Sequence, residues 1–501
     1  FFENWFFSSL GAQSHFRPRR ISIDLDGAMG AQKAAGPGRS GHSTSTIQGI
    51  VIEDDMRKLF VVGCWLLCFA QGHSQITLSD CVEQALAHNP GLRVAGADSS
   101  LAGEDLAQAR AARLPSLDFS GSYRRQSAVP EMKITPIQLP FGGGTYSPFP
   151  GGGFQLGTFD NFDFKMTVSQ PLFTGFRLSQ RVQATQARVQ AAGEDLNRQR
   201  AELIARVENA YGIVLKTAKI LAIAQSGKEQ VAAHVQDVQN FVDQGLLKKE
   251  ELLKAQVKLS EAELLVVQAE NGCRMSRTVL ENLSGRTLPA EATFADMPAP
   301  QQEPRELQAA IAQAMSNRLE LRVLDANRGA ATAVKKIAQG NRLPAMAAFG
   351  TVGYGKPGLD LIKKEWMDYW VVGVAAEWKL WNGGQTRSQI QQSAIRINAL
   401  DEMERQIRDG ITLDVTQAFL QLQEVQQRLS VSRTMEQQAL ESYRVAELQY
   451  RQGVSTQTDF FDAQSVLTRS RLSLAQADID WCLALTNWRR ALGVIEEPYV
   501  K

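Results

Sequence analysis

The sequence contains no stretch of about 18 or more consecutive apolar residues, which excludes an ordinary α-helical membrane protein. It also lacks an excess of basic residues, because 54 Lys and Arg balance 53 Asp and Glu to a net charge of +1. This balance argues against a dedicated nucleic-acid-binding protein, which would carry a basic face. With 44% hydrophobic residues and only 17 prolines in 501 residues, the chain is neither a disordered tail nor a collagen-like repeat.

Sequence motifs of enzymes are missing too. The chain has no HExxH, GxSxG, GxGxxG or Walker-type sequence, which are signatures of metalloproteases, hydrolases and nucleotide-binding proteins. Only His88 and His234 stand well inside the expected mature chain. Pairs of carboxylates occur on helices so highly charged that solvated faces explain them better than acid–base catalysis. We therefore expect no enzymatic activity, no cofactor and no bound metal ion.

The longest apolar run has the features of an export signal. Residues 59–70 follow the basic start Met56-Arg57-Lys58 and precede small residues. These are the three parts of a secretory signal peptide, so residues 56–74 are predicted to be removed on export. Two other interpretations are open, namely a buried helix or strand and a lipoprotein signal that uses Gly63-Cys64. Residues 1–55 show no periodicity and are predicted to be an over-extended N-terminus outside the mature protein.

Cysteine is scarce, with five residues and no CxxC pair. Cys64 and Cys68 would leave with the signal, so Cys81, Cys273 and Cys482 remain as an odd and widely spaced set. An exported protein with three scattered cysteines is not built on a disulfide framework. We expect each of the three to be packed in the protein interior.

The chain is internally duplicated, which has to be recognised before any motif is interpreted. The recurring residues are Leu92-Arg93 and Arg113-Leu114-Pro115 (again at Leu321-Arg322 and Arg342-Leu343-Pro344), then Gly175, Gly245 and Gly285 (again at Gly383, Gly453 and Gly493). Within each group the offset is constant, and one insertion in one loop accounts for the change between groups. We predict two repeats, 75–285 and 305–493, with a linker at 286–304 and a short tail at 494–501.

Each repeat is predicted to contain a helix, a strand, a loop, a strand, a very long helix, a turn and a helix. The long helices carry apolar residues in heptads, which indicate coiled-coil seams. The positions are Val182, Val189, Leu196, Leu203 and Ala210, with Val207, Val214 and Leu221 in a second series, and Ile390, Ile397, Ile411 and Ala418 in the other copy, interrupted by Glu404. The stretch from Gly175 to Gly245 would span about 105 Å as a helix, over three times a bilayer core of roughly 30 Å. We therefore expect helical rods outside the membrane.

The segments before the long helices alternate apolar and polar residues with period two. The apolar positions are Leu117, Phe119 and Tyr123; Phe162, Phe164, Met166 and Val168; Met346, Ala348, Val352 and Tyr354; and Trp370, Val372, Val374, Ala376, Trp378 and Leu380. Such strands suit a transmembrane β-barrel, although a half-buried soluble sheet gives the same alternation. The export signal favours the barrel, and because four strands cannot close one, several chains would have to pool their strands. The Gly- and Pro-rich residues 127–161 are predicted to form a long exposed loop.

Over nearly all of residues 76–501, the chain resembles the TolC-type family of outer-membrane efflux and secretion channels. The resemblance is carried by residues 85–90 (ALAHNP), the Arg-Leu-Pro before both first strands, residues 170–175 (QPLFTG), and the turns at 244–247 (QGLL) and 450–454 (YRQGV). It implies a mainly α fold with membrane β-strands, in which long antiparallel coiled-coil helices form a periplasmic α-barrel. It also implies a homotrimer with a shared twelve-strand β-barrel in outer-membrane lipid. The implied partners are a periplasmic adaptor (membrane fusion) protein and an inner-membrane pump of the RND, ABC or MFS type.

The resemblance points to the periplasmic tips of the helical hairpins as the functional region. The predicted adaptor-docking residues are Gly245, Leu246 and Leu247 in one turn and Gly453, Val454 and Ser455 in the other. Asp459 and Asp462 match the family's constricting ring of carboxylates, and their spacing places both on one helix face. Three chains would bring six carboxylates around one axis, which attracts cations. The alternative is a pair of solvated charges near a helix N-terminus, where Asp is favourable in any case.

The resemblance also implies that a link between side chains of neighbouring helices holds the tip shut. Tyr450 matches one member of this gate latch, and Glu251 stands where its acidic partner is expected. The family's Arg, two residues after the second glycine, is Ser455 here, so Lys248, Lys249 or Arg451 would have to supply the positive charge. Tyr450 as a simple aromatic residue of the helical seam is an equally weighted alternative.

The sequence therefore predicts an outer-membrane channel-tunnel that passively conducts small molecules or secreted polypeptides from an inner-membrane pump and adaptor to the exterior. The alternative is a non-channel periplasmic coiled-coil adaptor or spacer. An adaptor has one helical hairpin flanked by soluble β domains, whereas two hairpins, each preceded by two strands, match a channel. The cargo is chosen largely by the inner-membrane partner, which this sequence does not identify.

Overall fold

The structure is a computed structural model that describes residues 75–133, 137–138, 141–142, 145–146, 153–289, 292–297 and 306–496. The predicted N-terminal extension 1–55 and signal segment 56–74 lie outside the described residues. The predicted linker 286–304 is described only in part.

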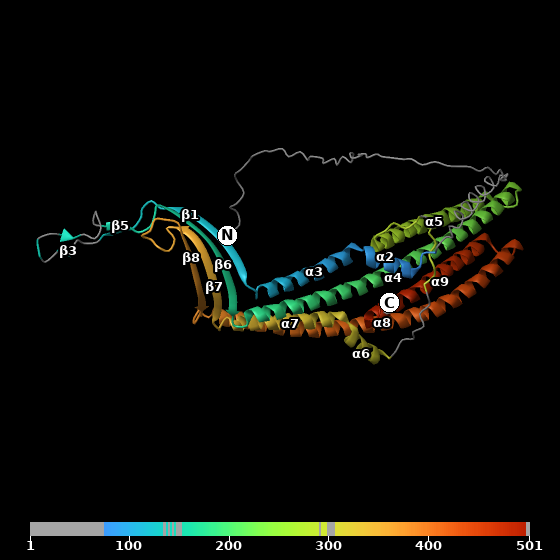
Figure 1. Ribbon diagram of the computed structural model, residues 1–501. Helices are drawn as coiled ribbons and strands as arrows, with labels where there is room; N and C mark the ends of the chain where they lie inside the picture. The colour runs from blue at the N-terminus through green and yellow to red at the C-terminus, as the bar shows by residue number, and fades with distance from the viewer. Residues whose placement is uncertain are drawn as a thin grey trace, which may run out of the picture. The chain divides into compact units, whose positions relative to one another are not determined.

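The described helices form two sets of four with matching lengths (Figure 1). α2 (Leu78–His88), α3 (Pro90–Ala111), α4 (Arg177–Asp243) and α5 (Lys249–Ser284) contain 11, 22, 67 and 36 residues. α6 (Leu307–Asn317), α7 (Leu319–Gly340), α8 (Gln385–Arg451) and α9 (Gln457–Leu492) contain the same numbers in the same order. Equal lengths in equal order are what a tandem duplication produces, while the repeat boundaries remain predictions. Of the helices described, none combines the length and the apolar character needed to cross a membrane.

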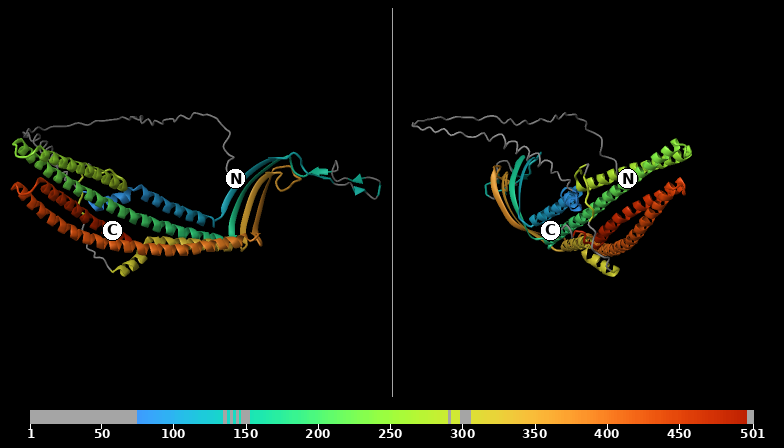
Figure 2. Two further views of the ribbon diagram at one scale, coloured as in Figure 1. Left: turned by 180° about the vertical axis from the view of Figure 1, so that it is seen from behind. Right: turned by 90° about the vertical axis from the view of Figure 1, so that its right-hand side faces the viewer.

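α4 and α8 confirm the two predicted rods, since 67 residues span about 100 Å as a helix. Each forms an antiparallel hairpin with the helix that follows it, α4 with α5 and α8 with α9. α4 also packs against α3, α7 and α9. The two views of Figure 2 show the hairpin of α4 and α5 next to the hairpin of α8 and α9. This arrangement makes α4 the central helix of the bundle.

The predicted seams are buried along the middle of the long helices. Leu203, Val207, Ala210 and Val214 of α4 and Ile411 and Ala418 of α8 are buried, while Val182, Val189, Leu196, Leu221, Ile390 and Ile397 are half-buried. The short helices α2 and α6 cover the buried stretches and complete two apolar cores. Cys81 lies in the first core, as expected. Cys273 and Cys482 are only half-buried, which corrects that prediction, because a pair of helices is too thin to enclose every residue.

The four predicted strands form one antiparallel sheet in the order β1-β6-β7-β8. They are β1 (Ser116–Arg125), β6 (Asp160–Phe173), β7 (Ala345–Lys356) and β8 (Met367–Glu377). β8 ends before Trp378 and Leu380, which the alternation had included. The reason is the junction with α8, where the Trp378 indole N–H donates to the Arg342 carbonyl at 3.0 Å and the chain turns through Gly383 and Gly384 at positive φ.

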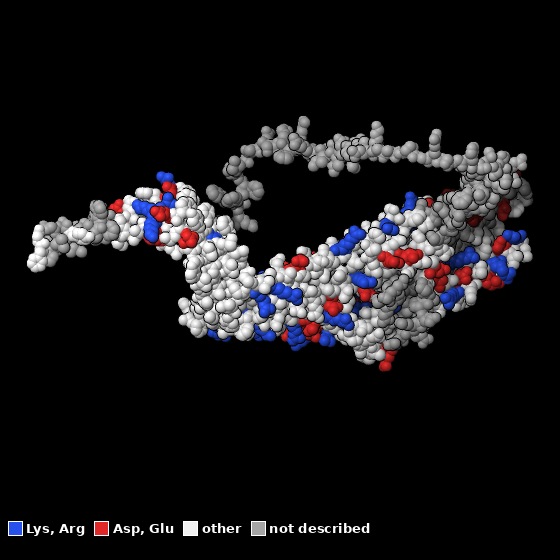
Figure 3. All heavy atoms as spheres, viewed as in Figure 1, with Lys and Arg blue, Asp and Glu red and all other residues white. Residues whose placement is uncertain are grey.

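The register of the sheet brings the apolar positions of all four strands to one face. Leu117 lies opposite Val168, Met166 opposite Val352, and Val352 opposite Trp370. These side chains are exposed, and Figure 3 shows a sheet surface almost free of charged residues beside helices that carry both signs. The other face is polar on β1 and β6, with hydroxyl pairs such as Ser116–Ser169 at 2.8 Å, and mixed on β7 and β8, where Thr351 lies beside Phe349 and Val371. In the described sheet, β1 and β8 are the edge strands, each paired on one side only.

The predicted loop at 127–161 contains short ladders of its own. β2 (Glu131–Lys133) pairs with β5 (Gly153–Gln155), and β3 (Ile137–Gln138) pairs with β4 (Thr145–Tyr146). Figure 1 shows this strand-bearing extension continuing away from the helices beyond the four-stranded sheet. The described parts of the loop are therefore a β-hairpin and not an irregular connection.

Candidate functional site

The two hairpin turns have almost the same backbone geometry. Gly245 follows α4 at φ 74° and Gly453 follows α8 at φ 75°, a left-handed conformation that glycine adopts without steric cost. In the first turn the Leu246 N–H donates to the Phe241 carbonyl at 2.8 Å, and in the second the Val454 N–H donates to the Gln449 carbonyl at 2.9 Å. These bonds satisfy the last carbonyls of each helix. The repeated glycines thus end the rods at equivalent places.

Each turn presents one apolar side chain to solvent. Leu246 is 66% exposed and Val454 is 75% exposed, at equivalent positions of the two turns. The neighbouring Leu247 and Ser455 are half-buried. The exposure of these two apolar side chains is compatible with the adaptor-docking prediction, which stays a prediction.

Asp459 caps α9 as part of a reciprocal hydrogen-bonded box. Its Oδ2 accepts from the Thr456 backbone N–H at 3.0 Å and from the Thr456 hydroxyl at 2.7 Å, while the Thr456 Oγ1 accepts from the Asp459 N–H at 3.2 Å. These bonds lower the pKa of Asp459 below its ordinary value of 3.8, and the bond from the Thr456 hydroxyl contributes most. Asp462 lies one turn further on and is exposed like Asp459. In the single chain Asp459 is therefore a capping carboxylate, and the ring remains a prediction.

Tyr450 belongs to an aromatic cluster that joins the two hairpins. The members of this tip cluster are His234 of α4, Tyr443 and Tyr450 of α8, and Phe460 and Phe461 of α9. Tyr450 stacks on Phe460 at a centroid distance of 5.4 Å, and His234 stacks on Phe460 at 4.5 Å. Burial raises the pKa of Tyr450, with the nearby charge of Glu251 as the next cause. Within the single chain Tyr450 is thus an aromatic residue of the seam.

His234 is the polar centre of the tip cluster. Its side chain is 7% exposed, and its Nε2 has no hydrogen-bond partner among the described residues. Burial lowers the pKa of His234 below its ordinary value of 6.5, and Asp237 opposes this shift. Local sequence patterns do not identify this residue, although the adjacent pair Phe460-Phe461 directly after Asp459 is a signal of a tightly packed tip.

Glu251 contacts α9 through its backbone and not through its carboxylate. Its carbonyl accepts from the Gln457 side-chain amide at 3.2 Å, while its carboxylate pairs with Lys254 at 3.0 Å. Among the described residues, no hydrogen bond joins Glu251 to the Tyr450 hydroxyl. Arg451 pairs with Glu447 of its own helix at 2.6 Å. The two predicted latch residues lie at the same tip, but within one chain they are not linked to each other.

Further from the tip, charged pairs tie α9 to both long helices. Asp480 binds Lys216 of α4 at 2.9 Å and Arg428 of α8 at 2.8 Å. Glu208 of α4 is fully buried and accepts from Arg489 of α9 at 2.6 Å. Because buried charges persist only when they are paired and hydrogen-bonded, these contacts fix the relative position of the helices above the tip.

Comparisons with known proteins identify the family and the fold. The family model described as "Outer membrane efflux protein" matches residues 81–286 and 310–494. Outer membrane protein TolC of Salmonella enteritidis is 21% identical over 453 residues, which cover 88% of this chain and 87% of the relative.

Two solved channels share the fold. The Campylobacter jejuni outer membrane channel CmeC has a TM-score of 0.69 at 14% identity, over 84% of this chain and 87% of that chain. The open state of the Neisseria gonorrhoeae outer membrane channel MtrE has a TM-score of 0.67 at 18% identity, over 83% and 89%. The predicted resemblance and fold class are thereby confirmed. The chain belongs to the outer membrane efflux protein family, as an outer-membrane channel protein whose helical part lies in the periplasm.

Proposed function

We propose that three copies of this chain pool their sheets into one membrane barrel and their long helices into one tunnel, through which cargo is exported. The sheet is the observation that carries the proposal. It has an exposed apolar face, a polar face and two edge strands. Lipid tolerates neither an open sheet edge nor an unpaired backbone, so β8 of one copy would pair with β1 of the next.

The direction in which the sheet would face follows from its side chains. Trp370 and Val372 of β8 are 74% and 72% exposed on the apolar face, which suits contact with lipid. The opposite face, with its serine and threonine hydroxyls, suits a water-filled lumen. Exposed apolar residues of the hairpins, such as Leu253 and Val257 of α5 and Leu420 of α8, support helix contacts between copies.

The barrel is tested by a pair of single substitutions on adjacent residues. Val372→Lys places a charge on the apolar face and should cost about 2–4 kcal/mol near the middle of a bilayer. Val371→Lys places the same charge on the polar face and should be tolerated. We expect the heat-modifiable oligomer in outer-membrane fractions to be lost in the first variant and kept in the second. Equal loss, or a soluble periplasmic chain in the parent, would reject the pooled barrel.

At the tip we propose a cation-attracting ring of Asp459 and Asp462 and a gate latch that uses Tyr450 and Glu251 between copies. Because Asp459 also caps α9, Asp462 is the cleaner residue to test. Asp462→Asn should reduce cation block and cation preference in planar-bilayer recordings. The control Thr456→Ala removes the cap, keeps both carboxylates and should keep the block. If Asp462→Asn leaves ion preference unchanged, the ring is rejected.

The tips are further proposed to dock a periplasmic adaptor, which would couple the channel to an inner-membrane pump. The supporting observation is the exposure of Leu246 and Val454 at the two turns. Leu246→Glu or Val454→Glu should abolish export in cells and leave the trimer intact. The control Gln244→Glu adds the same charge beside the turn and should export normally. Normal export from both tip variants would refute the docking surface.

A further inference from the structure

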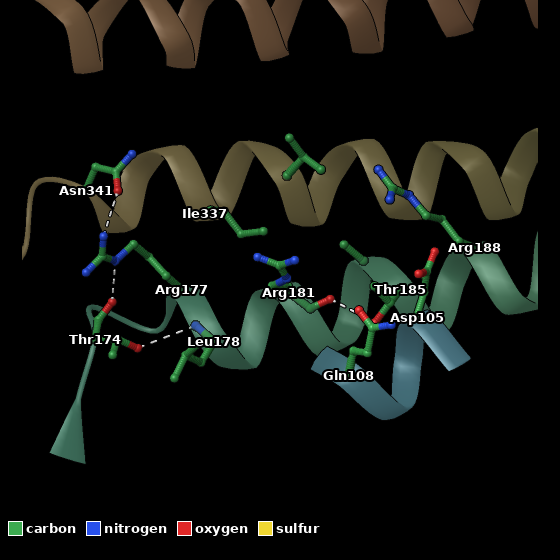
Figure 4. A pocket seen from close by; sticks show the side chains of 12 residues that line it. Asp105, Gln108, Thr174, Arg177, Leu178, Arg181, Thr185, Arg188, Ile337 and Asn341 are labelled. Carbon is green, nitrogen blue, oxygen red and sulfur yellow. Dashed lines mark hydrogen bonds between the residues drawn. The ribbon is translucent and has the colours of Figure 1, made fainter. Parts of the chain in front are cut away.

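A cleft lies between α3, α4 and α7, directly beyond the end of β6. Its volume is about 760 Å³. Asp105 and Gln108 of α3 line one side, Ile337 and Asn341 of α7 line another, and the α4 side carries three arginines (Figure 4). These arginines are Arg177, Arg181 and Arg188.

The first arginine is held in place by the surrounding backbone and side chains. The Arg177 Nε–H donates to the Thr174 carbonyl at 2.8 Å, and a terminal N–H donates to Asn341 Oδ1 at 3.3 Å. Neither acceptor carries a negative charge. The guanidinium is therefore oriented without being neutralised.

The other two arginines have no acidic partner in the part of the chain that the structure describes. Figure 4 shows the side chains of Arg181 and Arg188 extending from α4 toward the same space as Arg177. Neither forms an ion pair with a carboxylate of the described residues. Arg198, further along the same helix, binds both Asp195 at 2.8 Å and Glu202 at 2.7 Å. Arg198 thus has an acid on the turn before it and on the turn after it, whereas Asp105, the one carboxylate among the residues that line the cleft, forms no ion pair with Arg181 or Arg188.

A second cavity extends the positive region toward α8. It measures about 210 Å³, shares Arg188 and Val334 with the first, and is lined in addition by Arg396 of α8. Together the two cavities are lined by four guanidinium groups and one carboxylate, that of Asp105. Positive charges gathered in a concave site raise the local concentration of anions.

We propose that this arginine cleft binds a phosphate-bearing anion. The guanidinium group is planar and donates two parallel hydrogen bonds to phosphate oxygens. Several guanidiniums around one cavity match the several oxygens of a phosphate better than the two of a single carboxylate. Two kinds of molecule carry a suitable phosphate group. One is a phospholipid headgroup and the other is a soluble phosphate anion. The cleft begins where the sheet proposed to lie in the membrane ends, so both lipid and soluble ligands could reach it.

The test uses the full-length channel purified in detergent. Pyrophosphate is titrated calorimetrically at low salt, where surface electrostatics are least screened. The cleft variant is Arg181→Gln with Arg188→Gln. The control is Arg206→Gln with Arg274→Gln, two exposed arginines outside both cavities that remove the same charge. For the lipid arm, each protein is released from nanodiscs of equal parts phosphatidylglycerol and phosphatidylcholine, and retained phosphatidylglycerol is counted by native mass spectrometry.

For a soluble anion, we expect pyrophosphate affinity to fall about tenfold for each guanidinium removed and to be unchanged in the control. For a lipid headgroup, the parent and the control retain phosphatidylglycerol and the cleft variant does not. Either result supports the cleft as a phosphate site. If neither ligand distinguishes the cleft variant from the control, the proposal is overturned. This outcome is independent of the assembly tests above, since binding is read without export or conduction.

Discussion

Acidification should loosen the contact between the two hairpins through His234. The imidazole is buried against three aromatic rings from α8 and α9, and its Nε2 has no partner among the described residues that could stabilise a second proton. Protonation would place a positive charge in this site. Asp237, on the same helix, is the charge that partly offsets the cost.

The charged groups of the other elements act mainly on the neighbouring tyrosines. Glu251 of α5 and Asp237 act on Tyr450. Glu447 and Arg451 of α8 and Arg471 of α9 act on Tyr443. Burial therefore dominates the pKa of His234, and it lowers that pKa.

The sign and size of the effect follow from linkage. The folded tip binds a proton less readily than the unfolded chain, so stability is complete above the ordinary pKa of 6.5 and is lost as pH falls below it toward the lowered folded pKa. The loss amounts to about 1.4 kcal/mol per pH unit and per subunit across that interval. Each drop of one pH unit in this interval would raise the fraction of molecules with a locally unfolded tip about tenfold.

Hydrogen exchange of the amides at 450–464, corrected for intrinsic rates, measures this opening between about pH 7.5 and about pH 5.0. In the parent chain we expect protection to fall with acidification below the ordinary pKa. His234→Phe keeps an aromatic ring and should remove the pH dependence. His88→Gln removes the other described histidine and should keep it. If His234→Phe responds to acid as the parent does, the burial argument is wrong.

Two further predictions concern stability. Glu208→Gln should lower the free energy of unfolding by about 3–5 kcal/mol, since it leaves the Arg489 guanidinium without its buried counter-charge. The control Glu441→Gln breaks an exposed ion pair with Arg444 and should change the free energy of unfolding very little. Gly453→Ala should destabilise the turn by about 1 kcal/mol, because only glycine adopts its positive φ freely. Gly410→Ala lies in the interior of α8, where no atom lies within 4 Å of the added carbon, and should stabilise the protein by about 0.5–1 kcal/mol. Thermal melting followed by circular dichroism measures each pair, and a reversed order within either pair would contradict the structural reason given.

Element types and the faces of the sheet were predictable because they depend on local periodicity. Alternation at Leu117 and Phe119 identified a strand, and the heptad series through Leu203 and Ala210 identified a rod. The box formed by Thr456 and Asp459 also has a sequence signature, Thr-x-x-Asp before a helix. The same carboxylate could therefore have been recognised as a cap from the sequence alone.

Features that depend on distant segments were not predictable. His234 lies more than two hundred residues before Phe460, and nothing in the local pattern of either indicates that their rings stack. The spacing of Arg181 and Arg188 places them on one helix face, but the residues opposite them, among which Asp105 is the one acid, depend on α3 and α7. The hairpin of β2 and β5 was missed because glycine and proline dominate that stretch and conceal its short strands.

The matched helix lengths of the two halves have a consequence for how the chain can change. If each subunit encoded a single hairpin, a mutation would change every hairpin of a homo-oligomer at once. Because this chain encodes two hairpins, each can change independently of the other. They have done so at their turns: α9 is capped by hydrogen bonds between Thr456 and Asp459, while Lys248, the residue before α5, makes no side-chain cap. Duplication has thereby allowed two arms of equal length to acquire different caps at their turns.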